Sequence, residues 1–267
     1  MGSGPRCSWR GDVSRPRLLV SGPWARGQVL AIKGRDARRL TRVLRLGKGD
    51  VLSIFDGQGV EGGARILELR GWAEVKLEVL WVERAQAESP LKIHLVQGLP
   101  KWPKMEVVAQ KVTELGVEEV CGLLARRSVP WSGEGEKWKR LERIMEEASR
   151  QCGRANVPKL SGPWKLEEFL RYQRGEPGAR LLLWEGERTN SLKAALEAWK
   201  IPPEEVWLAV GPEGGFDEEE VKIMNQEGYT PVSMGPRILR TETASMAVVA
   251  IAQYLWGDMG GRASGMP

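Results

Sequence analysis

The spacing of apolar residues changes character at about Pro90. Before this point, short runs such as Asp50–Phe55 and Glu74–Leu80 alternate apolar and polar residues with a period of two. Beyond it, apolar runs such as Glu119–Leu124 are continuous and are separated by stretches with helical spacing. Alternation is typical of a strand with one buried face, and a continuous run is typical of a strand buried on both faces. The pattern predicts a β-rich N-terminal part followed by an α/β part.

The N-terminal part is predicted to form a small β-barrel with one helix. Gly and Asp turns, such as Asp56–Gly59, separate its short strands. The strands are predicted at Gln28–Lys33, Asp50–Phe55, Gly63–Leu69 and Glu74–Leu80, and the helix near Ala37–Leu46. We therefore divide the chain into an extension at residues 1–14, a barrel at 15–84, a linker at 85–90 and a second domain at 91–267.

The second part alternates strands with helices, which is typical of a mostly parallel sheet. Met105–Leu115 and Trp138–Cys152 repeat apolar residues at helical spacing and are expected to pack in a core. Glu242–Trp256 is apolar nearly all round, which favours burial in a core or in a subunit interface. It is too short to span a bilayer, which takes about 20 residues. Strands are predicted at Leu91–Val96, Glu119–Leu124, Arg180–Trp184, Glu205–Val210 and Tyr229–Met234.

The strand that ends at Val210 runs into a glycine-rich turn, Gly211-Pro-Glu-Gly-Gly-Phe216. Asp217 and Glu220 follow with the spacing of a capping box, which predicts the start of a helix. Backbone N–H groups at such a junction can bind an anion or the polar edge of a ligand. The turn has neither the ending of a phosphate-binding P-loop nor a dinucleotide fingerprint, which disfavours a nucleoside triphosphate.

Two further strands end in turns of a similar kind. Trp184–Glu187 follows one of them, and Met234–Arg240 follows the other, with Thr241 placed to cap the last helix. Ligands of open α/β sheets lie outside the carboxyl ends of the strands. The three turns can therefore converge on one ligand-binding face of the sheet.

Positive charge is concentrated in the first third of the chain. Residues 1–89 hold 16 Lys and Arg against 10 Asp and Glu, a net charge of +6, whereas residues 90–267 hold 24 against 25. One short segment contains Arg35, Arg38, Arg39, Arg42, Arg45 and Lys48. An ordinary solvated face is one explanation, but the near-neutral remainder favours local contact with RNA phosphates.

The cysteines and the histidine give no sign of a metal site. Cys7, Cys121 and Cys152 show no paired or metal-ligand spacing, and the single histidine, His94, lies in an apolar strand. A zinc site or a disulfide framework is therefore disfavoured. Residues 1–14 are polar and lack the apolar core of a signal peptide. We expect a cytoplasmic protein with no metal and no membrane partner.

The two glycine-bearing turns together resemble the C-terminal signature of the RsmE-type ribosomal RNA methyltransferases, which belong to the knotted SPOUT class. The resemblance covers most of the chain from about Arg15 onward. Its segments, in chain order, are Leu40–Asp50, Lys111–Val117, Glu147–Pro158, Gly211–Phe216 and Gly235–Ala244. It is the combination of these segments, rather than any single one, that is specific.

The resemblance implies a fold, an activity and partners. The fold is an α/β SPOUT methyltransferase domain with a trefoil knot, preceded by a PUA-like β-barrel that binds RNA. The activity is S-adenosylmethionine-dependent methylation of uridine N3 in small-subunit (16S) ribosomal RNA, so the partner is that RNA or the small ribosomal subunit. A homodimer formed through the C-terminal helix is also implied. Because N3 lies on the base-pairing edge, the uridine must be unpaired or extruded.

The resemblance also implies roles for particular residues. Arg240 and Arg237 are the candidates for stabilising negative charge on the uridine, and Glu242 is expected to support the second turn. Glu213 either orients the base or accepts its proton, or it has a structural role and holds its turn through backbone N–H groups. The expected cofactor-binding residues are Trp184, Glu185, Gly211, Pro212, Glu213, Gly214, Gly215, Met234, Gly235, Ile238, Leu239 and Arg240. The expected RNA-binding residues are Arg17, Arg38, Arg39, Arg42, Arg45, Lys111, Arg150 and Arg154.

The chain departs from the family pattern at three places. Arg39 stands where the family commonly has a histidine, Cys152 stands where it often has a serine, and residues 1–14 precede the usual start. Two other functions stay open at this point. A non-catalytic RNA-binding protein would leave the three turns without a ligand, so binding of S-adenosylmethionine tests it. A methyltransferase acting on a ribose 2′-oxygen or on transfer RNA would methylate a different atom, which mapping of the product would reveal.

Overall fold

The computed structural model describes residues 15–86, 88–131 and 135–260. The chain divides into two compact units, Met1–Ala87 with Arg150–Asn156, and Glu88–Ser149 with Val157–Pro267. The return of Arg150–Asn156 to the first unit had no signal in the sequence, because it depends on tertiary contacts rather than on hydropathy. The N-terminal extension at residues 1–14 lies outside the described residues.

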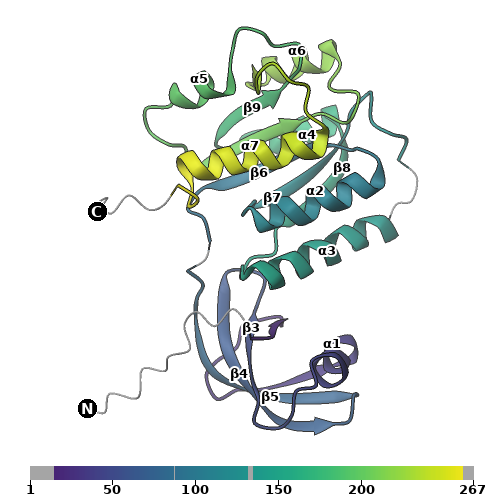
Figure 1. Ribbon diagram of the computed structural model, residues 1–267, viewed down its shortest axis with the longest axis vertical. Helices are drawn as coiled ribbons and strands as arrows, with labels where there is room; N and C mark the ends of the chain where they lie inside the picture. The colour runs from purple at the N-terminus through teal and green to yellow at the C-terminus, as the bar shows by residue number, and fades with distance from the viewer. Residues whose placement is uncertain (1–14, 87, 132–134, 261–267) are drawn as a thin grey trace. The chain divides into compact units, whose positions relative to one another are not determined.

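The first unit is built on a five-stranded half-barrel sheet in the order β1-β3-β4-β5-β2 (Figure 1). The strands are β1 (Arg17–Leu19), β2 (Val29–Lys33), β3 (Val51–Phe55), β4 (Val60–Arg70) and β5 (Glu74–Arg84). β1 pairs parallel to β3, and the other neighbours pair antiparallel. Val75, Leu77 and Val79 alternate along β5 and are buried in the core of this unit. The β-rich N-terminal part is therefore confirmed, although β4 and β5 are longer than predicted.

A short helical segment follows β2. It consists of α1 (Gly34–Arg38) and a π-helical turn, η1 (Arg39–Val43). The boundaries predicted for this helix, Ala37–Leu46, were wrong at both ends. Arg45 has a φ of 53°, a left-handed conformation that does not continue a right-handed helix. Leu40 is buried while several arginines of the segment are exposed, so its basic side faces solvent.

Within the described residues, the second unit is built on a six-stranded parallel sheet in the order β11-β9-β10-β6-β7-β8. The strands are β6 (Lys92–Gly98), β7 (Glu119–Leu124), β8 (Lys159–Lys165), β9 (Ala179–Leu183), β10 (Glu205–Val210) and β11 (Thr230–Val232). All except β8 overlap strands predicted from the sequence. β8 was missed because Gly162 and Pro163 interrupt it, and both residues are unusual inside a strand.

Helices cover both faces of the parallel sheet. They are α2 (Trp102–Glu114), α3 (Glu136–Cys152), α4 (Leu166–Gln173), α5 (Leu192–Glu197), α6 (Glu218–Gln226) and α7 (Thr241–Trp256). One core cluster joins the sheet to α2, α3, α5 and α7, and another joins its opposite face to α4 and α6. Figure 1 shows α2 and α7 side by side over the first face. Ile93 and Leu95 of β6 belong to the first cluster and Val96 to the second, so this strand is buried on both faces as its continuous run predicted.

The apolar stripes predicted for the helices are part of the core. Met105, Ala109 and Val112 of α2 are fully buried, as are Leu141 and Met145 of α3. The capping box predicted before α6 is also present. The side chain of Asp217 accepts from the backbone N–H of Glu220, and the side chain of Glu220 accepts from the backbone N–H of Asp217. Helices α4 and α5 were not delimited from the sequence, and both are short.

Candidate functional site

The strand order brings the carboxyl ends of β11, β9 and β10 next to one another. The chain runs from β6 outward to β8 and then continues on the other side of β6. Such a reversal of strand order is where open α/β sheets bind ligands. The loops after these three strands line a cavity of about 360 Å³, a volume within the range of small-molecule sites.

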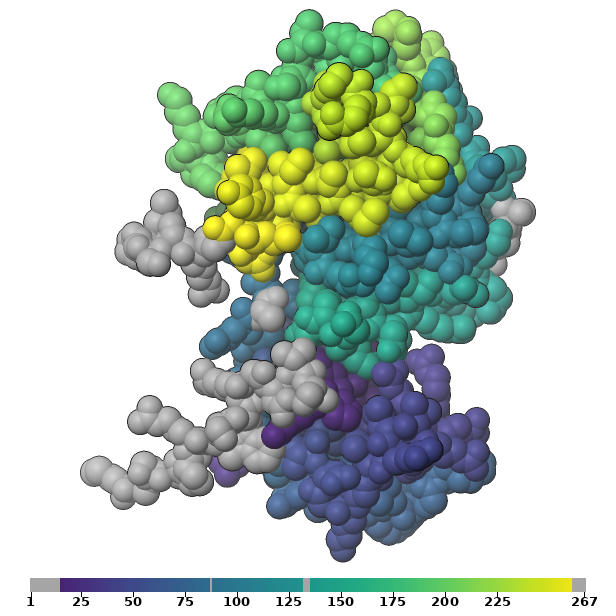
Figure 2. Space-filling model, viewed as in Figure 1, coloured from purple at the N-terminus to yellow at the C-terminus, as the bar shows by residue number. Residues whose placement is uncertain are grey.

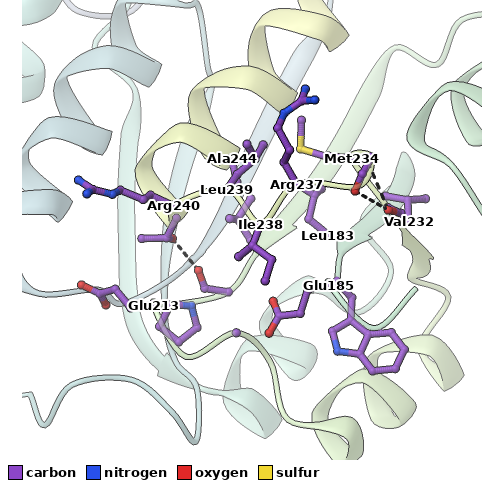
Figure 3. A pocket seen from close by; sticks show the side chains of 18 of the residues that line it. Leu183, Glu185, Glu213, Val232, Met234, Arg237, Ile238, Leu239, Arg240 and Ala244 are labelled. Carbon is purple, nitrogen blue, oxygen red and sulfur yellow. Dashed lines mark hydrogen bonds between the residues drawn. The ribbon is translucent and has the colours of Figure 1, made fainter. Parts of the chain in front are cut away.

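Most of the predicted cofactor residues line this cavity (Figure 3). They are Trp184, Glu185, Gly211, Pro212, Glu213, Gly215, Met234, Gly235, Ile238, Leu239 and Arg240, together with the predicted catalytic residue Arg237. Gly214 does not line it, and its carbonyl oxygen instead accepts a hydrogen bond from Arg127 Nη1 at 3.0 Å. Arg127 therefore holds the β10 loop from outside the cavity.

Sequence analysis missed a second group of lining residues. They are Lys104, Leu183, Arg188, Val210, Val232, Ser233, Pro236, Thr241 and Ala244. Pro236 lies within the predicted turn Met234–Arg240, and the others except Lys104 lie within a few residues of a predicted turn, so extending each turn would have found them. Lys104 belongs to α2, and only the tertiary structure brings it to the cavity.

Two glycines allow the β10 loop to approach its neighbours. Gly215 has a φ of +69°, and a Cβ atom there would collide with the carboxylate of Glu185 in the β9 loop. At the end of β6, a Cβ atom on Gly98 would lie 2.6 Å from Cδ of Pro212. Glycine is the residue that fits both positions, because it has no Cβ atom and adopts positive φ without strain.

A buried polar network joins the β10 loop to the start of α7. The hydroxyl of Thr241 donates to the carbonyl oxygen of Gly211 at 2.6 Å and accepts from Nε2 of Gln97 at 3.0 Å. The hydroxyl of Ser245 donates to Oε1 of the same Gln97. The prediction that Thr241 caps the helix was wrong, because Arg240 holds the N-cap position and no side chain bonds the helix end. Thr241 instead fixes the loop to the helix.

The β9 loop is held beside β11 by side-chain hydrogen bonds. Oε1 of Glu187 accepts from the backbone N–H groups of Thr189 at 2.7 Å and of Asn190 at 2.9 Å. The bond from Asn190, together with those from the hydroxyl and the backbone N–H of Thr189, lowers the pKa of Glu187 to about 2. Nδ2 of Asn190 then donates to the carbonyl oxygen of Pro231 at 2.9 Å. The loop that carries Glu185 is thereby tied to the neighbouring strand.

Glu213 is engaged with the start of α2. Its Oε1 accepts from the backbone N–H of Lys101 at 3.1 Å and lies 3.3 Å from Nζ of Lys104. Burial acts to raise the pKa of Glu213, but the bond from Lys101 and the ion pair with Lys104 lower it overall. Lys104 also lies 3.5 Å from Oε2 of Glu242. This geometry favours the structural role of Glu213 over that of a proton acceptor.

Arg237 and Arg240 supply positive charge that the fold does not use. Both line the cavity and are exposed. Within the described ranges, neither guanidinium forms a hydrogen bond or an ion pair. Figure 3 shows the two groups pointing in different directions, so each can meet a different part of a ligand.

The predicted RNA-binding residues of the barrel helix differ in exposure. Arg38, Arg42 and Arg45 are exposed, and Arg39 is half-buried. This basic segment therefore presents most of its charge to solvent.

The remaining predicted RNA-binding residues are engaged within the protein. Arg17 forms an ion pair with Glu61 at 3.3 Å, and Lys111 forms one with a glutamate of its own helix at 2.8 Å. Arg150 and Arg154 are only 8% and 5% exposed. Such burial does not favour direct contact with RNA for these two arginines.

The part of the chain that the structure describes contains neither a candidate metal site nor a candidate membrane-spanning helix. Across residues 15–86, 88–131 and 135–260, no group of three or more His, Cys, Asp or Glu side chains is placed to hold a metal ion. The same residues include no helix with the length and apolar character that crossing a membrane requires.

Comparison with protein families identifies both parts of the chain. Residues 87–253 match the family described as RNA methyltransferase domain, and residues 32–77 match the RNA methyltransferase PUA domain. Among curated proteins, ribosomal RNA small subunit methyltransferase E from Synechocystis is 35% identical over 80% of this chain and 68% of its own length. The protein of the same name from a Buchnera aphidicola strain is 28% identical over 91% of this chain and 94% of its own length.

Solved structures agree with these matches. Ribosomal RNA small subunit methyltransferase E from Neisseria gonorrhoeae, crystallised with S-adenosylmethionine, is 30% identical, with a TM-score of 0.83 over 92% of this chain and 99% of that one. A methyltransferase from Legionella pneumophila, also solved with this cofactor, is 32% identical, with a TM-score of 0.82 over the same shares. The predicted PUA-like and SPOUT architecture is thus confirmed, while the trefoil knot stays a prediction. The chain belongs to the RNA methyltransferase family that includes ribosomal RNA small subunit methyltransferase E.

Proposed function

We propose that this protein methylates N3 of one uridine in small-subunit (16S) ribosomal RNA, with S-adenosylmethionine as the methyl donor. The observation that carries the proposal is the cavity enclosed by the β9, β10 and β11 loops. It lies in a chain that aligns along nearly its whole length with two proteins crystallised with this cofactor. A ribosomal RNA substrate would place the protein in the cytoplasm.

The lining residues fit S-adenosylmethionine. Leu183 and Leu239 offer apolar surface for a flat base, and the loop backbones offer N–H and C=O groups to its polar edge. Glu185 adds a carboxylate for a cationic group. When bound, the cofactor supplies an electrophilic methyl carbon on a sulfonium.

The arginines of the β11 loop are suited to stabilise the methyl acceptor. Loss of the N3 proton to solvent leaves negative charge on the carbonyl oxygens of uridine, and a guanidinium beside them favours that anion. Arg240 and Arg237 are exposed at the cavity and have no partner in the described part of the chain. Glu213, held ionised by Lys101 and Lys104, fixes the wall of the cavity in this scheme.

The test is methyl transfer from labelled S-adenosylmethionine to small ribosomal subunits that lack native modification, with the product mapped by mass spectrometry. We expect N3-methyluridine at one site with the wild type. Arg240→Ala should lower the single-turnover rate by about 100-fold, as loss of one oxyanion-stabilising donor does. Arg171→Ala, which changes an exposed arginine of α4, is the matched control and should leave the rate unchanged. Methylation of ribose or of transfer RNA would overturn the substrate assignment, and failure to bind the cofactor would overturn the enzyme assignment.

We further propose that two copies associate through α7. Tyr254 and Leu255, near its C-terminal end, are 64% and 47% exposed, and Figure 2 shows this helix uncovered at the surface. A two-fold contact would bury the same apolar face of both copies. Analytical ultracentrifugation should give a dimer for the wild type and a weaker one for Tyr254→Glu, whereas a wild-type monomer at micromolar concentration would contradict the proposal.

A further inference from the structure

The turn between β4 and β5 presents an exposed tryptophan. Trp72 is 52% exposed, and it is not among the hydrophobic side chains packed against the core of the first unit. A single exposed hydrophobic side chain is ordinary at a protein surface. Trp72 is informative because of the side chains that lie over its ring.

Two arginines lie over the ring of Trp72. Cζ of Arg38 is 5.0 Å from the ring centroid, and Cζ of Arg42 is 5.6 Å from it. Both distances are within the range of cation–π contacts. Among the described residues, no carboxylate lies within ion-pairing distance of either guanidinium. The ring is thereby oriented by two cations that keep their full charge, and about half of its surface stays open.

The carboxylates that flank Trp72 in the turn between β4 and β5 are already paired with other residues. Glu74 lies 3.4 Å from Nζ of Lys33, and Glu68 lies 2.9 Å from both Arg70 and Lys76. They therefore do not compensate the two arginines, which place positive charge over the ring.

We propose that Trp72, Arg38 and Arg42, the tryptophan–arginine site, bind an unpaired base of the RNA substrate and its adjoining phosphate. Proteins that bind single-stranded nucleic acid combine aromatic rings, on which bases stack, with arginines that contact the backbone. The inference rests on the proposed function, because the substrate class is RNA. It assigns to the first unit one base-stacking position that composition and charge did not reveal.

The first experiment compares full-length wild type with Trp72→Ala and Trp72→Phe. Trp72→Ala should weaken binding of a fluorescein-labelled single-stranded RNA about tenfold, since loss of one stacked base has an effect of this order. Binding of a duplex of the same length should change little. KM for small ribosomal subunits should rise by a similar factor, while kcat and the Kd for S-adenosylmethionine stay unchanged. Trp72→Phe should retain most of the affinity.

Matched controls separate this site from a general surface effect. Trp199, 44% exposed on the second unit, has no arginine over its ring within the described ranges, so Trp199→Ala should leave RNA affinity unchanged. The double variant Arg38→Gln and Arg42→Gln should reduce the salt dependence of RNA binding, by a slope of roughly 0.7 for each phosphate that the protein no longer neutralises.

Each outcome decides between the two proposals. Wild-type affinity for single-stranded RNA in both Trp72→Ala and the double arginine variant would overturn the tryptophan–arginine site, whatever the enzyme methylates. Equal losses on single-stranded RNA and on duplex would overturn base stacking. If the wild type binds RNA through Trp72 but does not methylate ribosomal RNA, the site survives and the proposed function fails.

Discussion

At the scale of single residues, the cavity depends on positions where a side chain is missing. Gly215 combines a φ of +69° with close contact to Glu185, so backbone conformation and crowding act at the same atom. A Cβ atom at Gly215 can be accommodated only if the carboxylate of Glu185 moves, and Glu185 lines the cavity. This glycine sets the shape of the site as well as the path of the chain.

Gly215→Ala should therefore weaken both folding and cofactor binding. We expect the free energy of unfolding to fall by about 1 kcal/mol, the cost of a left-handed alanine, and the Kd for S-adenosylmethionine to rise several-fold. Gly175→Ala is the control, because Gly175 has a φ of +87° but open space around its missing Cβ. Denaturant unfolding and calorimetric titration of both variants check this. Equal cofactor affinity in the two variants would show that crowding at Glu185 has no effect.

Glu213 gives a second prediction at this scale. If the carboxylate of Glu213 acts by holding Lys101 and Lys104, Glu213→Gln keeps an oxygen that can accept from the backbone N–H of Lys101. This variant should then lower kcat less than tenfold. Loss of a general base lowers the rate by roughly 100-fold or more. The bond from Lys101 and the ion pair with Lys104 lower the pKa of Glu213 from its ordinary value, so Glu213→Gln should not move the acid limb of the pH–rate profile. A fall in kcat of about 1000-fold, or loss of that limb, would identify it as the base instead.

At the scale of elements, the site is assembled by contacts between the ends of strands and the first turn of α7. Gln97 of β6 joins Thr241 and Ser245 of α7, and Thr241 joins the β10 loop. All three side chains are buried, so each bond that is broken leaves a polar group without water. The loop and the helix are consequently expected to move as one piece.

Thr241→Val, which removes the hydroxyl but keeps the shape, tests this coupling. We expect a loss of about 1–3 kcal/mol in the free energy of unfolding and a weaker affinity for S-adenosylmethionine. Thr113→Val is the control, because the hydroxyl of Thr113 is buried and bonds the carbonyl of Ala109 within its own helix at 2.7 Å. The control should lose stability without losing cofactor affinity. Unchanged affinity in Thr241→Val would refute the coupling.

The elements also show how far the sequence was informative. Continuous apolar runs located four of the six described strands of the parallel sheet, because burial on both faces leaves a local signal. The strand-like stretch Tyr229–Met234 located a fifth, β11. The turn after Val210 was predictable for a similar reason, since glycines mark close approach of the backbone. The roles of Lys104 and Gln97 could not be predicted from the sequence. A lysine on a helix and a glutamine in a strand gain these roles only through contacts with residues more than 100 positions away.

At the scale of the whole molecule, the carboxyl ends and the amino ends of the parallel strands differ in chemistry. The cavity lies at the carboxyl ends of the strands, whereas a buried carboxylate, that of Glu119, lies at their amino ends. There Oε2 of Glu119 lies 3.0 Å from Nδ1 of His94, and its Oε1 accepts from the hydroxyl of Tyr172 at 2.6 Å. Burial acts to raise the pKa of Glu119, but the bonds from His94 and Tyr172 and the charge of Lys159 lower it to about 2.

Glu119 should therefore contribute to stability against acid. Its pKa is about 2 when folded and near the ordinary 4.5 when unfolded, so the contribution is complete above about pH 4.5 and is lost as pH falls toward 2. Its size is on the order of 3 kcal/mol. Urea unfolding from pH 7 to pH 2 should show a smaller acid-induced loss in Glu119→Gln than in the wild type. Glu118→Gln, an exposed neighbour, should behave as the wild type does, and identical pH dependence in all three would refute the role of Glu119.

The return of the chain at Arg150–Asn156 limits how these proteins can be recombined. Asn156 forms bridges to Gly57 and Gln58, so a segment encoded after the first part of the second unit pairs with the turn between β3 and β4 of the first. The backbone passes between the units three times, and no single crossover point in the gene separates them. In a chimera of two relatives joined near Ala87, the barrel would come from one relative and the segment Arg150–Asn156 that packs with it from the other. Exchange of the PUA domain between family members therefore requires two separate stretches of sequence to be transferred together.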